Sequence, residues 1–354
     1  MKNLEFPVVG TKVKGLTKFF DINSPEGRKK YFEAKVGKEI RKIRSFLDDK
    51  TFIAYMLGKK NSGKGTYSQL IKEIFGKDKI ALVSVGDLIR EMDDWDSFTK
   101  TEKYKRMKRY YRGYMAWEDA VNAHLGRSTS KLLPTEFILA LLKAHIDELT
   151  GMSIFIDGLP RDMDQISYSL YFRDLINYRN DPDIFVLIDI PLSVIDERIK
   201  YRVICPNCKT TRNIKLLPTS KIKYESKTKH FYLECDNPDC KGGKMVGKEG
   251  DDKGIAPIKE RLEKDEEILR KAFSLYGVPK ILLRNHVLVS ESNKYFDNYE
   301  ITPEFVYKLG KGEKVVVSEK PWSVLDDNGQ MCNSLMAPPV VISLIKQLAD
   351  TLSS

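Results

Sequence analysis

A glycine-rich segment, Gly58-Lys-Lys-Asn-Ser-Gly63-Lys64-Gly65-Thr66, stands between an apolar run and a stretch with helical periodicity. Glycines in such a loop let backbone N–H groups turn inward around phosphate oxygens, and the N-terminus of the following helix adds positive potential. Lys64 can then bridge the β- and γ-phosphates, while the Thr66 hydroxyl binds phosphate or the magnesium shell. The segment therefore predicts a nucleoside triphosphate site.

A carboxylate and a set of arginines could act on such a ligand. Asp157 ends the apolar run Ile154-Phe-Ile, and a carboxylate at the C-terminal edge of a parallel sheet suits the hydration shell of magnesium. Transfer between two nucleotides crowds negative charges together, and planar forked cations neutralise them. The candidates are Arg90, Arg161, Arg198, Arg202 and Arg261. Taken alone, each arginine is better explained as a solvated surface charge.

Further motifs follow one another in a fixed order. They are Ser84-Val-Gly-Asp87-Leu-Ile-Arg90, Lys131-Leu-Leu133-Pro-Thr-Glu136, Asp157-Gly-Leu-Pro-Arg161 followed by Gln165, and Pro191 followed by Arg198 and Arg202. Together with the glycine loop they resemble adenylate kinase, of the nucleoside monophosphate (NMP) kinase family, over about residues 51–290. The resemblance implies a P-loop three-layer α/β sandwich with a parallel central sheet, an NMP-binding insert and a lid that closes over ATP. It also implies reversible transfer of the terminal phosphate of ATP to AMP, giving two ADP.

The same resemblance implies a role for each matching residue. ATP, with its Mg²⁺, would be held by Asn61, Ser62, Gly63, Lys64, Gly65, Thr66 and Arg198. AMP would be held by Val85, Arg90, Leu133, Gly158, Arg161, Gln165 and Arg261, with Gln165 reading the adenine edge. The catalytic group would be Lys64, Arg161, Arg202, Arg261 and Asp157.

The sequence departs from the family pattern in three places. Lys60-Asn61 replaces the usual Pro-Gly of the phosphate loop, and we expect Asn61 to supply the left-handed backbone conformation that glycine would give. Val85 replaces a hydroxyl residue near the acceptor base, which weakens the case for strict AMP choice. Glu249, with Lys248 beside it, falls near the place of the arginine that returns from the lid.

Four of the five cysteines form two knuckles, Cys205-Pro-Asn-Cys208 and Cys235-Asp-Asn-Pro-Asp-Cys240. Their spacing suits one tetrahedral four-thiolate zinc site, with disulfides or free thiols as the alternatives. Four protein ligands leave no open position, so the zinc would be structural and would rigidify a lid too small to bury its own core. His230 lies close by and could replace one ligand, although an ordinary exposed histidine is the preferred interpretation. Cys332 is expected to pack in the interior.

Short apolar runs alternate with helical stretches, a rhythm typical of a parallel sheet with helices on both faces. We expect an N-terminal helical extension at 1–50, whose apolar face packs on the main body. We expect core segments at 51–90, 151–202 and 251–299, with the P-loop in the first. The NMP-binding insert is predicted at 91–150, the zinc lid at 203–250 and a C-terminal extension at 300–354.

Composition limits the remaining possibilities. The 354 residues include 60 Lys plus Arg against 50 Asp plus Glu, and the net charge of +10 fits an anionic partner, either a phosphorylated ligand or nucleic acid. No segment is apolar enough to span a membrane, and no targeting segment is evident, so we expect a cytoplasmic protein. We expect ATP and AMP as partners and a monomer, although no residue pattern fixes the oligomeric state.

Two alternative functions stay open. A UMP/CMP or other monophosphate kinase shares every motif above; Gln165 favours adenine, and Val85 is the reason for caution. An ATP-dependent RNA-binding switch protein would use the lysines and aromatic residues of the lid as its contact surface. The acceptor-site motifs argue against this second alternative, because an ATPase has no use for Arg90, Arg161 and Gln165.

Overall fold

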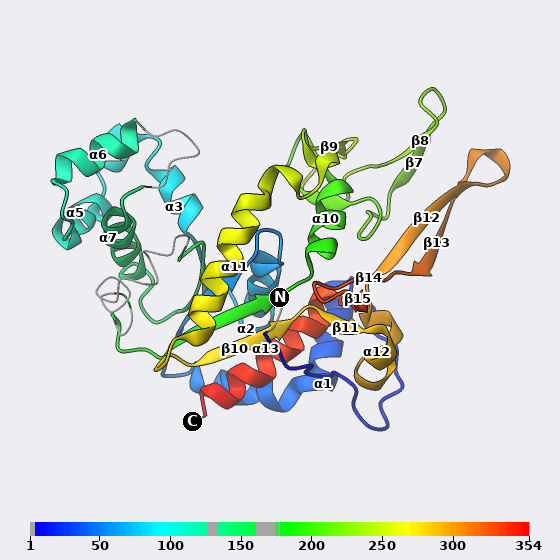
Figure 1. The fold of residues 1–354 in the computed structure, drawn as a ribbon, viewed down its shortest axis with the longest axis horizontal. Helices are drawn as coiled ribbons and strands as arrows, with labels where there is room; N and C mark the ends of the chain where they lie inside the picture. Colours follow the sequence, from blue (N-terminus) through cyan, green and yellow to red (C-terminus); the bar gives the residue numbers. More distant parts are fainter. Residues whose placement is uncertain (1–3, 127–132, 161–174, 176–177, 354) are drawn as a thin grey trace.

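The computed structural model describes residues 4–126, 133–160, 175 and 178–353. Its centre is a five-stranded parallel sheet with the strand order β10-β4-β1-β3-β2 (Figure 1). The strands are β1 (Ile53–Gly58), β2 (Ile80–Ser84), β3 (Ser153–Asp157), β4 (Asp183–Asp189) and β10 (Lys280–Arg284). The predicted parallel sheet is therefore confirmed.

The central strands are buried on both faces, which explains their continuous apolar sequences. In β1, Ile53, Tyr55 and Leu57 enter one core cluster, whereas Ala54 and Met56 enter the other. The first cluster lies under α3 (Val85–Glu91), α7 (Thr135–Ile146) and α11 (Lys259–Ser274), and the second under α1 (Pro25–Phe46), α2 (Lys64–Phe75) and α13 (Ala337–Thr351). Helices thus cover both faces, and the protein has three layers.

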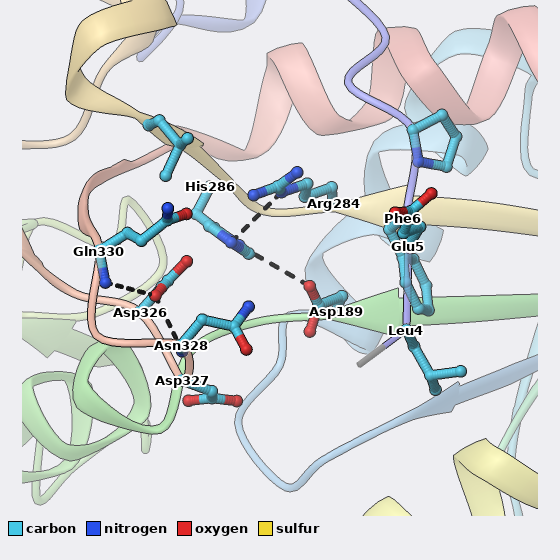
Figure 2. Close-up of a pocket in the computed structure, with 12 residues that line it drawn as sticks. Leu4, Glu5, Phe6, Asp189, Arg284, His286, Asp326, Asp327, Asn328 and Gln330 are labelled. Carbon is cyan, nitrogen blue, oxygen red and sulfur yellow. Dashed lines mark hydrogen bonds and ion pairs between the residues drawn. The ribbon is translucent and has the colours of Figure 1, made fainter. Parts of the chain in front are cut away.

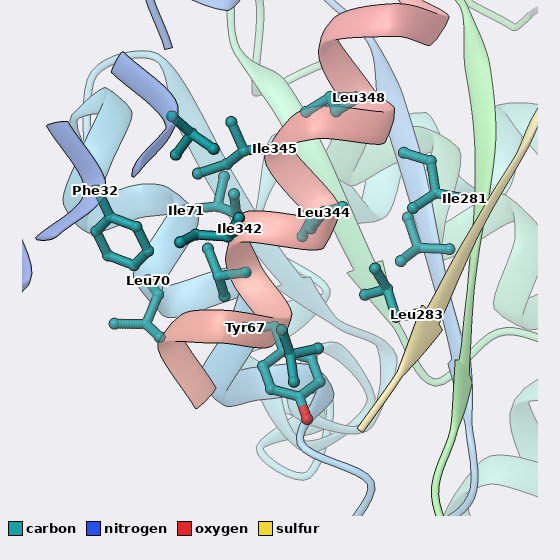
Figure 3. Close-up of a cluster of buried hydrophobic side chains, with 14 of the residues drawn as sticks. Phe32, Tyr67, Leu70, Ile71, Ile281, Leu283, Ile342, Leu344, Ile345 and Leu348 are labelled. Atoms are coloured by element: carbon teal, nitrogen blue, oxygen red, sulfur yellow. The ribbon is translucent and has the colours of Figure 1, made fainter. Parts of the chain in front are cut away.

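Both terminal extensions pack on the second core cluster. Helix α1 begins at Pro25, and the Ser24 side chain caps it by accepting from the Gly27 N–H. Its buried face includes Phe32, Ile40 and Ile43, which confirms the expected packing on the main body. Figure 3 shows α13 between α2 and β10, with Ile342, Leu344, Ile345 and Leu348 among the buried side chains.

The segment after α3 forms a small helical layer to one side of the sheet (Figure 1). It consists of α4 (Trp95–Phe98), α5 (Glu102–Tyr110) and α6 (Trp117–Leu125), which pack toward α7. Aromatic contacts hold it together; the Trp95 ring lies 5.8 Å from Tyr104 and 5.4 Å from His124. This segment lies within residues 91–150, where the NMP-binding insert was expected, and α7 belongs to the same range.

A second small body follows α10 (Leu192–Lys200) and contains the cysteines. One sheet joins β5 (Arg202–Ile204), β6 (Thr211–Asn213) and β9 (Val246–Gly247), and a hairpin joins β7 (Ile222–Glu225) to β8 (His230–Leu233). Its core cluster has four buried members, namely Cys205, Leu233, Cys235 and Met245. So few buried side chains give the body little hydrophobic stabilisation of its own.

The chain returns from this body and ends in a β-rich extension. Besides α11 and α13, the helical elements in this part of the chain are η1 (Asp251–Lys253), η2 (Ala256–Ile258), α12 (Val289–Tyr295), η3 (Asn298–Glu300) and η4 (Lys311–Glu313). A long hairpin pairs β12 (Pro303–Leu309) with β13 (Val315–Pro321), and a small sheet has the order β11-β15-β14, formed by His286–Leu288, Met331–Ser334 and Val324–Leu325. No helix in the described part of the chain has both the length and the apolar character needed to cross a lipid bilayer.

Candidate functional site

The glycine-rich loop joins the end of β1 to the start of α2. Gly63 has φ +103° and precedes the helix, and Asn61 has φ +65°. The expectation that Asn61 adopts the left-handed conformation is therefore confirmed. The side-chain oxygen of Ser62 and the Nδ2 of Asn61 are buried and have no hydrogen-bond partner among the described residues. Buried polar groups of this kind suit a loop that surrounds a polar ligand.

Lys64 opens α2 with its ammonium folded back over the loop. Its Nζ donates to the carbonyl of Gly58 at 2.8 Å and to the carbonyl of Lys59 at 3.3 Å. Asp157, at the end of β3, lies 3.8 Å from the same nitrogen. The sheet therefore brings together the lysine and the carboxylate that the sequence singled out, because β1 and β3 are adjacent and parallel.

Several further cations surround the loop. Burial lowers the pKa of Lys60, and the positive charges of Lys248, Arg202 and Arg261 lower it further. Arg202 forms two bonds of 2.7 Å to Asp251, and Arg261 donates to Asp265 at 2.8 Å. These cations come from the loop, the lid and α11, so the fold concentrates positive charge where a polyphosphate would lie.

Arg198 approaches the loop from α10. Its Nη1 donates to the carbonyl of Asn61 at 3.2 Å, and its Nη2 donates to the side-chain oxygen of Asn285 at the same distance. Burial lowers the pKa of Arg198, which Tyr67 partly offsets. The guanidinium is thus held beside the phosphate loop, on the element that leads into the lid.

A cavity of about 230 Å³ lies beside the start of α2 and α3. Its lining comes from α2, β2, α3, α7 and β3, and includes Gly65, Ser84, Asp87, His145 and Asp157. Arg90 lies near this cavity; its side chain is exposed and forms an ion pair with Asp87. The cavity adjoins the glycine-rich loop, because Gly65 and Asp157 line it and Asp157 lies 3.8 Å from the Lys64 Nζ.

The other acceptor-site residues fall in different environments. Val85 and Leu133 are buried in the first core cluster, and Gly158 follows β3 with φ +94°. Arg161 and Gln165 lie outside the described residues. Their expected roles with AMP stay predictions.

Curated proteins with similar sequences carry related names. Adenylate kinase of Syntrophomonas wolfei is 27% identical over 228 residues, which is 64% of this chain and 87% of the relative. Adenylate kinase of Clostridium tetani is 27% identical over 244 residues, or 69% of this chain and 94% of the relative. The mitochondrial GTP:AMP phosphotransferase of Drosophila melanogaster is 29% identical over 153 residues, or 43% of this chain and 57% of the relative. No family model matches the chain.

Over about two thirds of its length the chain is therefore similar in sequence to adenylate kinases. Its glycine-rich loop has Lys60-Asn61 where the pattern of these proteins has Pro-Gly, and the structure shows how this loop is held. Lys60, in place of the usual proline, has a backbone N–H that proline lacks, and this group donates to Asp265 at 2.8 Å. Asp265 also accepts from Arg261, so one buried carboxylate links the loop to α11.

The small body after α10, which was predicted to be the lid, holds the four cysteines close together. Their sulfur atoms all lie within 4.8 Å of one another; Cys205 is 3.8 Å from Cys240, and Cys208 is 3.5 Å from Cys235. A tetrahedral site with zinc–sulfur bonds of about 2.3 Å needs sulfur atoms about 3.8 Å apart, so the cluster fits the ion. His230 is exposed and lies outside the cluster, and Cys332 is buried in β15, as expected.

The sequence did not predict the carboxylates of α11 and the C-terminal extension that contact the glycine-rich loop. Lys59 is 1% exposed, and its Nζ lies 3.0 Å from Glu266 and 3.2 Å from Asp327. Neither Asp265 nor Glu266 belongs to a motif, and Asp327 lies far along the chain in the C-terminal extension.

Proposed function

We propose that this protein transfers the terminal phosphate of ATP to AMP, giving two molecules of ADP. The observation that carries the proposal is the contact of Lys64 with Asp157, a carboxylate that also lines the cavity beside α3. The positive charges of Lys248, Arg202 and Arg261 act on Lys60 in the same loop. The names of the curated relatives support the same reaction.

The reaction is a direct in-line displacement. An oxygen of the AMP phosphate attacks the γ-phosphorus of ATP, and the bond from that phosphorus to the β–γ bridging oxygen breaks to leave ADP. The attacking oxygen is already anionic, so no general base is needed. Lys64, Arg202 and Arg261 neutralise the negative charge that develops, and closure of the lid excludes water and suppresses ATP hydrolysis.

Magnesium, bound with ATP, supplies further charge neutralisation and aligns the phosphates. Asp157 would hold its hydration shell, since this carboxylate lies at the sheet edge beside Lys64 and its side chain is 41% exposed. Asp87 lines the same cavity from α3. Both carboxylates are of the hard oxygen type that magnesium prefers.

The four cysteines are proposed to bind one structural zinc ion. The separations of their sulfur atoms fit a tetrahedral thiolate site, and the small core of the lid leaves it dependent on such a cross-link. With all four positions taken by protein ligands, the ion would fix the lid's shape and take no part in phosphate transfer.

A panel of nucleotides tests the proposed reaction. The protein is incubated with ATP or GTP and with each of AMP, UMP, CMP and GMP, and the diphosphates are measured. The GTP arm is included because one relative is named a GTP:AMP phosphotransferase. Diphosphate from UMP or CMP in preference to AMP would assign the chain to a different monophosphate kinase, and ATP hydrolysis without transfer would support the switch-protein alternative.

Replacement of the central lysine tests the assigned site. Lys64→Met should reduce ADP formation by about a hundredfold or more, because a cation that stabilises transferring charge is lost. Lys77→Met, an exposed lysine beyond the same helix, is the matched control and should keep full activity. Both variants should melt near the temperature of the unmodified protein. Full activity in Lys64→Met would refute the assignment.

A further inference from the structure

The C-terminal extension returns to the phosphate loop after its long hairpin. Strands β14 and β15 pair with each other, and β15 pairs with β11, which follows the core strand β10. The turn between them is fixed by Asp326, whose Oδ1 accepts from the N–H groups of Asn328 and Gln330 at 2.9 and 2.8 Å (Figure 2). This turn presents Asp327 to the core.

Asp327 contacts two parts of the ATP site. Its Oδ2 accepts from the Lys59 Nζ at 3.2 Å, and its Oδ1 accepts from the Leu192 N–H at 2.8 Å. Lys59 is the second residue of the phosphate loop, and Leu192 begins α10, the helix that carries Arg198. Burial alone would raise the pKa of Asp327, but Lys59 and the Leu192 N–H outweigh it and leave the pKa below its usual value. The group is therefore a carboxylate at neutral pH.

The charge on Lys59 makes this contact strong. Its side chain is 1% exposed, and a buried ammonium without a counter-ion is costly. Glu266 from α11 supplies one carboxylate and Asp327 the other. The backbone carbonyl of Lys59 in turn accepts from the Lys64 ammonium. Fixing the Lys59 side chain thus fixes the part of the loop on which Lys64 rests.

From these contacts we infer that Asp327 is a positioning residue for the ATP site. It does not touch the nucleotide; it holds the first turn of the phosphate loop and the start of α10 in one arrangement. Through Asp327, the C-terminal extension then helps to shape the ATP site. Only the kinetic measurement below depends on the proposed function, because ATP binding can be measured in the absence of phosphate transfer.

Calorimetric titration of the full chain with ATP, and separately with AMP, tests this role. Asp327→Asn keeps the shape of the side chain and removes its charge. We expect its Kd for ATP to rise about tenfold or more, while its Kd for AMP changes less than twofold. If transfer is observed, KM for ATP should rise in the same proportion, with kcat within about threefold. Glu319→Gln, an exposed charge on the hairpin, is the control and should change nothing.

A double-mutant cycle separates positioning from general stability. Lys59→Met/Asp327→Asn should weaken ATP binding about as much as Lys59→Met alone, because the contact between Lys59 and Asp327 is already lost in that single variant. The double variant leaves neither charge buried alone, so it serves if the single variants do not fold. Unchanged ATP affinity in the folded variants, or equal losses for ATP and AMP, would overturn the inference. An unmodified protein that binds ATP without transferring phosphate would refute the proposed function and leave this inference standing.

Discussion

At the scale of single residues, His286 is held neutral by its surroundings. The Arg284 Nε lies 3.2 Å from the His286 Nε2, and because arginine can only donate, the proton of the neutral ring must be on Nδ1, which faces Asp189 at 4.0 Å (Figure 2). Burial, followed by the charge of Arg284, lowers the pKa of His286 from 6.5 to about 3. Burial also raises the pKa of the neighbouring Asp189.

This histidine predicts a dependence of stability on pH. The unfolded chain takes up a proton on His286 near pH 6.5 and the folded chain only near pH 3, so stability falls as pH falls between these values. Between pH 7 and pH 5, the free energy of unfolding should fall by about 2 kcal/mol more in the unmodified protein than in His286→Gln. Urea titrations at the two pH values measure the difference. Equal losses in both proteins would contradict the assigned protonation state.

The sequence could predict the position or conformation of a residue where this depends on nearby residues or on neighbouring strands. Asn61 illustrates this, because its left-handed conformation follows from the position of one residue in a nine-residue loop. Lys64 and Asp157 also followed, since neighbouring parallel strands bring them to one sheet edge. The partners of Lys59 could not be predicted: Asp327 lies 268 positions away, and only the tertiary fold brings the two together.

At the scale of elements, the lid should depend on its metal and the core should not. The buried cysteines belong to a core cluster separate from those of the central sheet. A chelator should therefore release one zinc ion per chain and reduce phosphate transfer, while the main melting transition shifts little. Cys235→Ser should lose the ion and Cys332→Ser, at a buried cysteine outside the cluster, should keep it. Retention of zinc in Cys235→Ser, measured by a colorimetric metal assay, would exclude the four-thiolate site.

The long hairpin β12–β13 is an element that the sequence did not predict. The core strands were predictable because each is a short continuous apolar run. In the hairpin, β12 is mostly half-buried and β13 is largely exposed, and the sequence identified the segment only as part of an extension. The hairpin reaches back to the lid: the Phe305 N–H donates to the Lys215 carbonyl at 2.8 Å, and the Tyr307 ring lies 5.6 Å from Phe231. Such contacts between segments far apart in sequence leave no periodic pattern in either one.

At the scale of the whole molecule, the C-terminal extension has two parts with different roles. The hairpin projects from the body (Figure 1), whereas α13 lies against α1, α2 and β10 inside the second core cluster. The buried face of α13 includes Val340, Ile342, Leu344, Ile345 and Leu348. Burial of each such side chain contributes about 1.5 to 3 kcal/mol. A domain of this kind is stable by only about 5 to 15 kcal/mol in total.

Two shortened chains should therefore behave differently. A chain that ends at residue 314 loses β15 and α13, and it should show no cooperative melting transition by circular dichroism, because the lost burial is comparable to the whole stability. A chain in which residues 304–320 are replaced by two glycines keeps both elements. Pro303 and Pro321 are opposite partners in the hairpin, so a short link can join them. This second chain should melt cooperatively within a few degrees of the unmodified protein. Cooperative melting of the first chain would show that α13 is dispensable to the core.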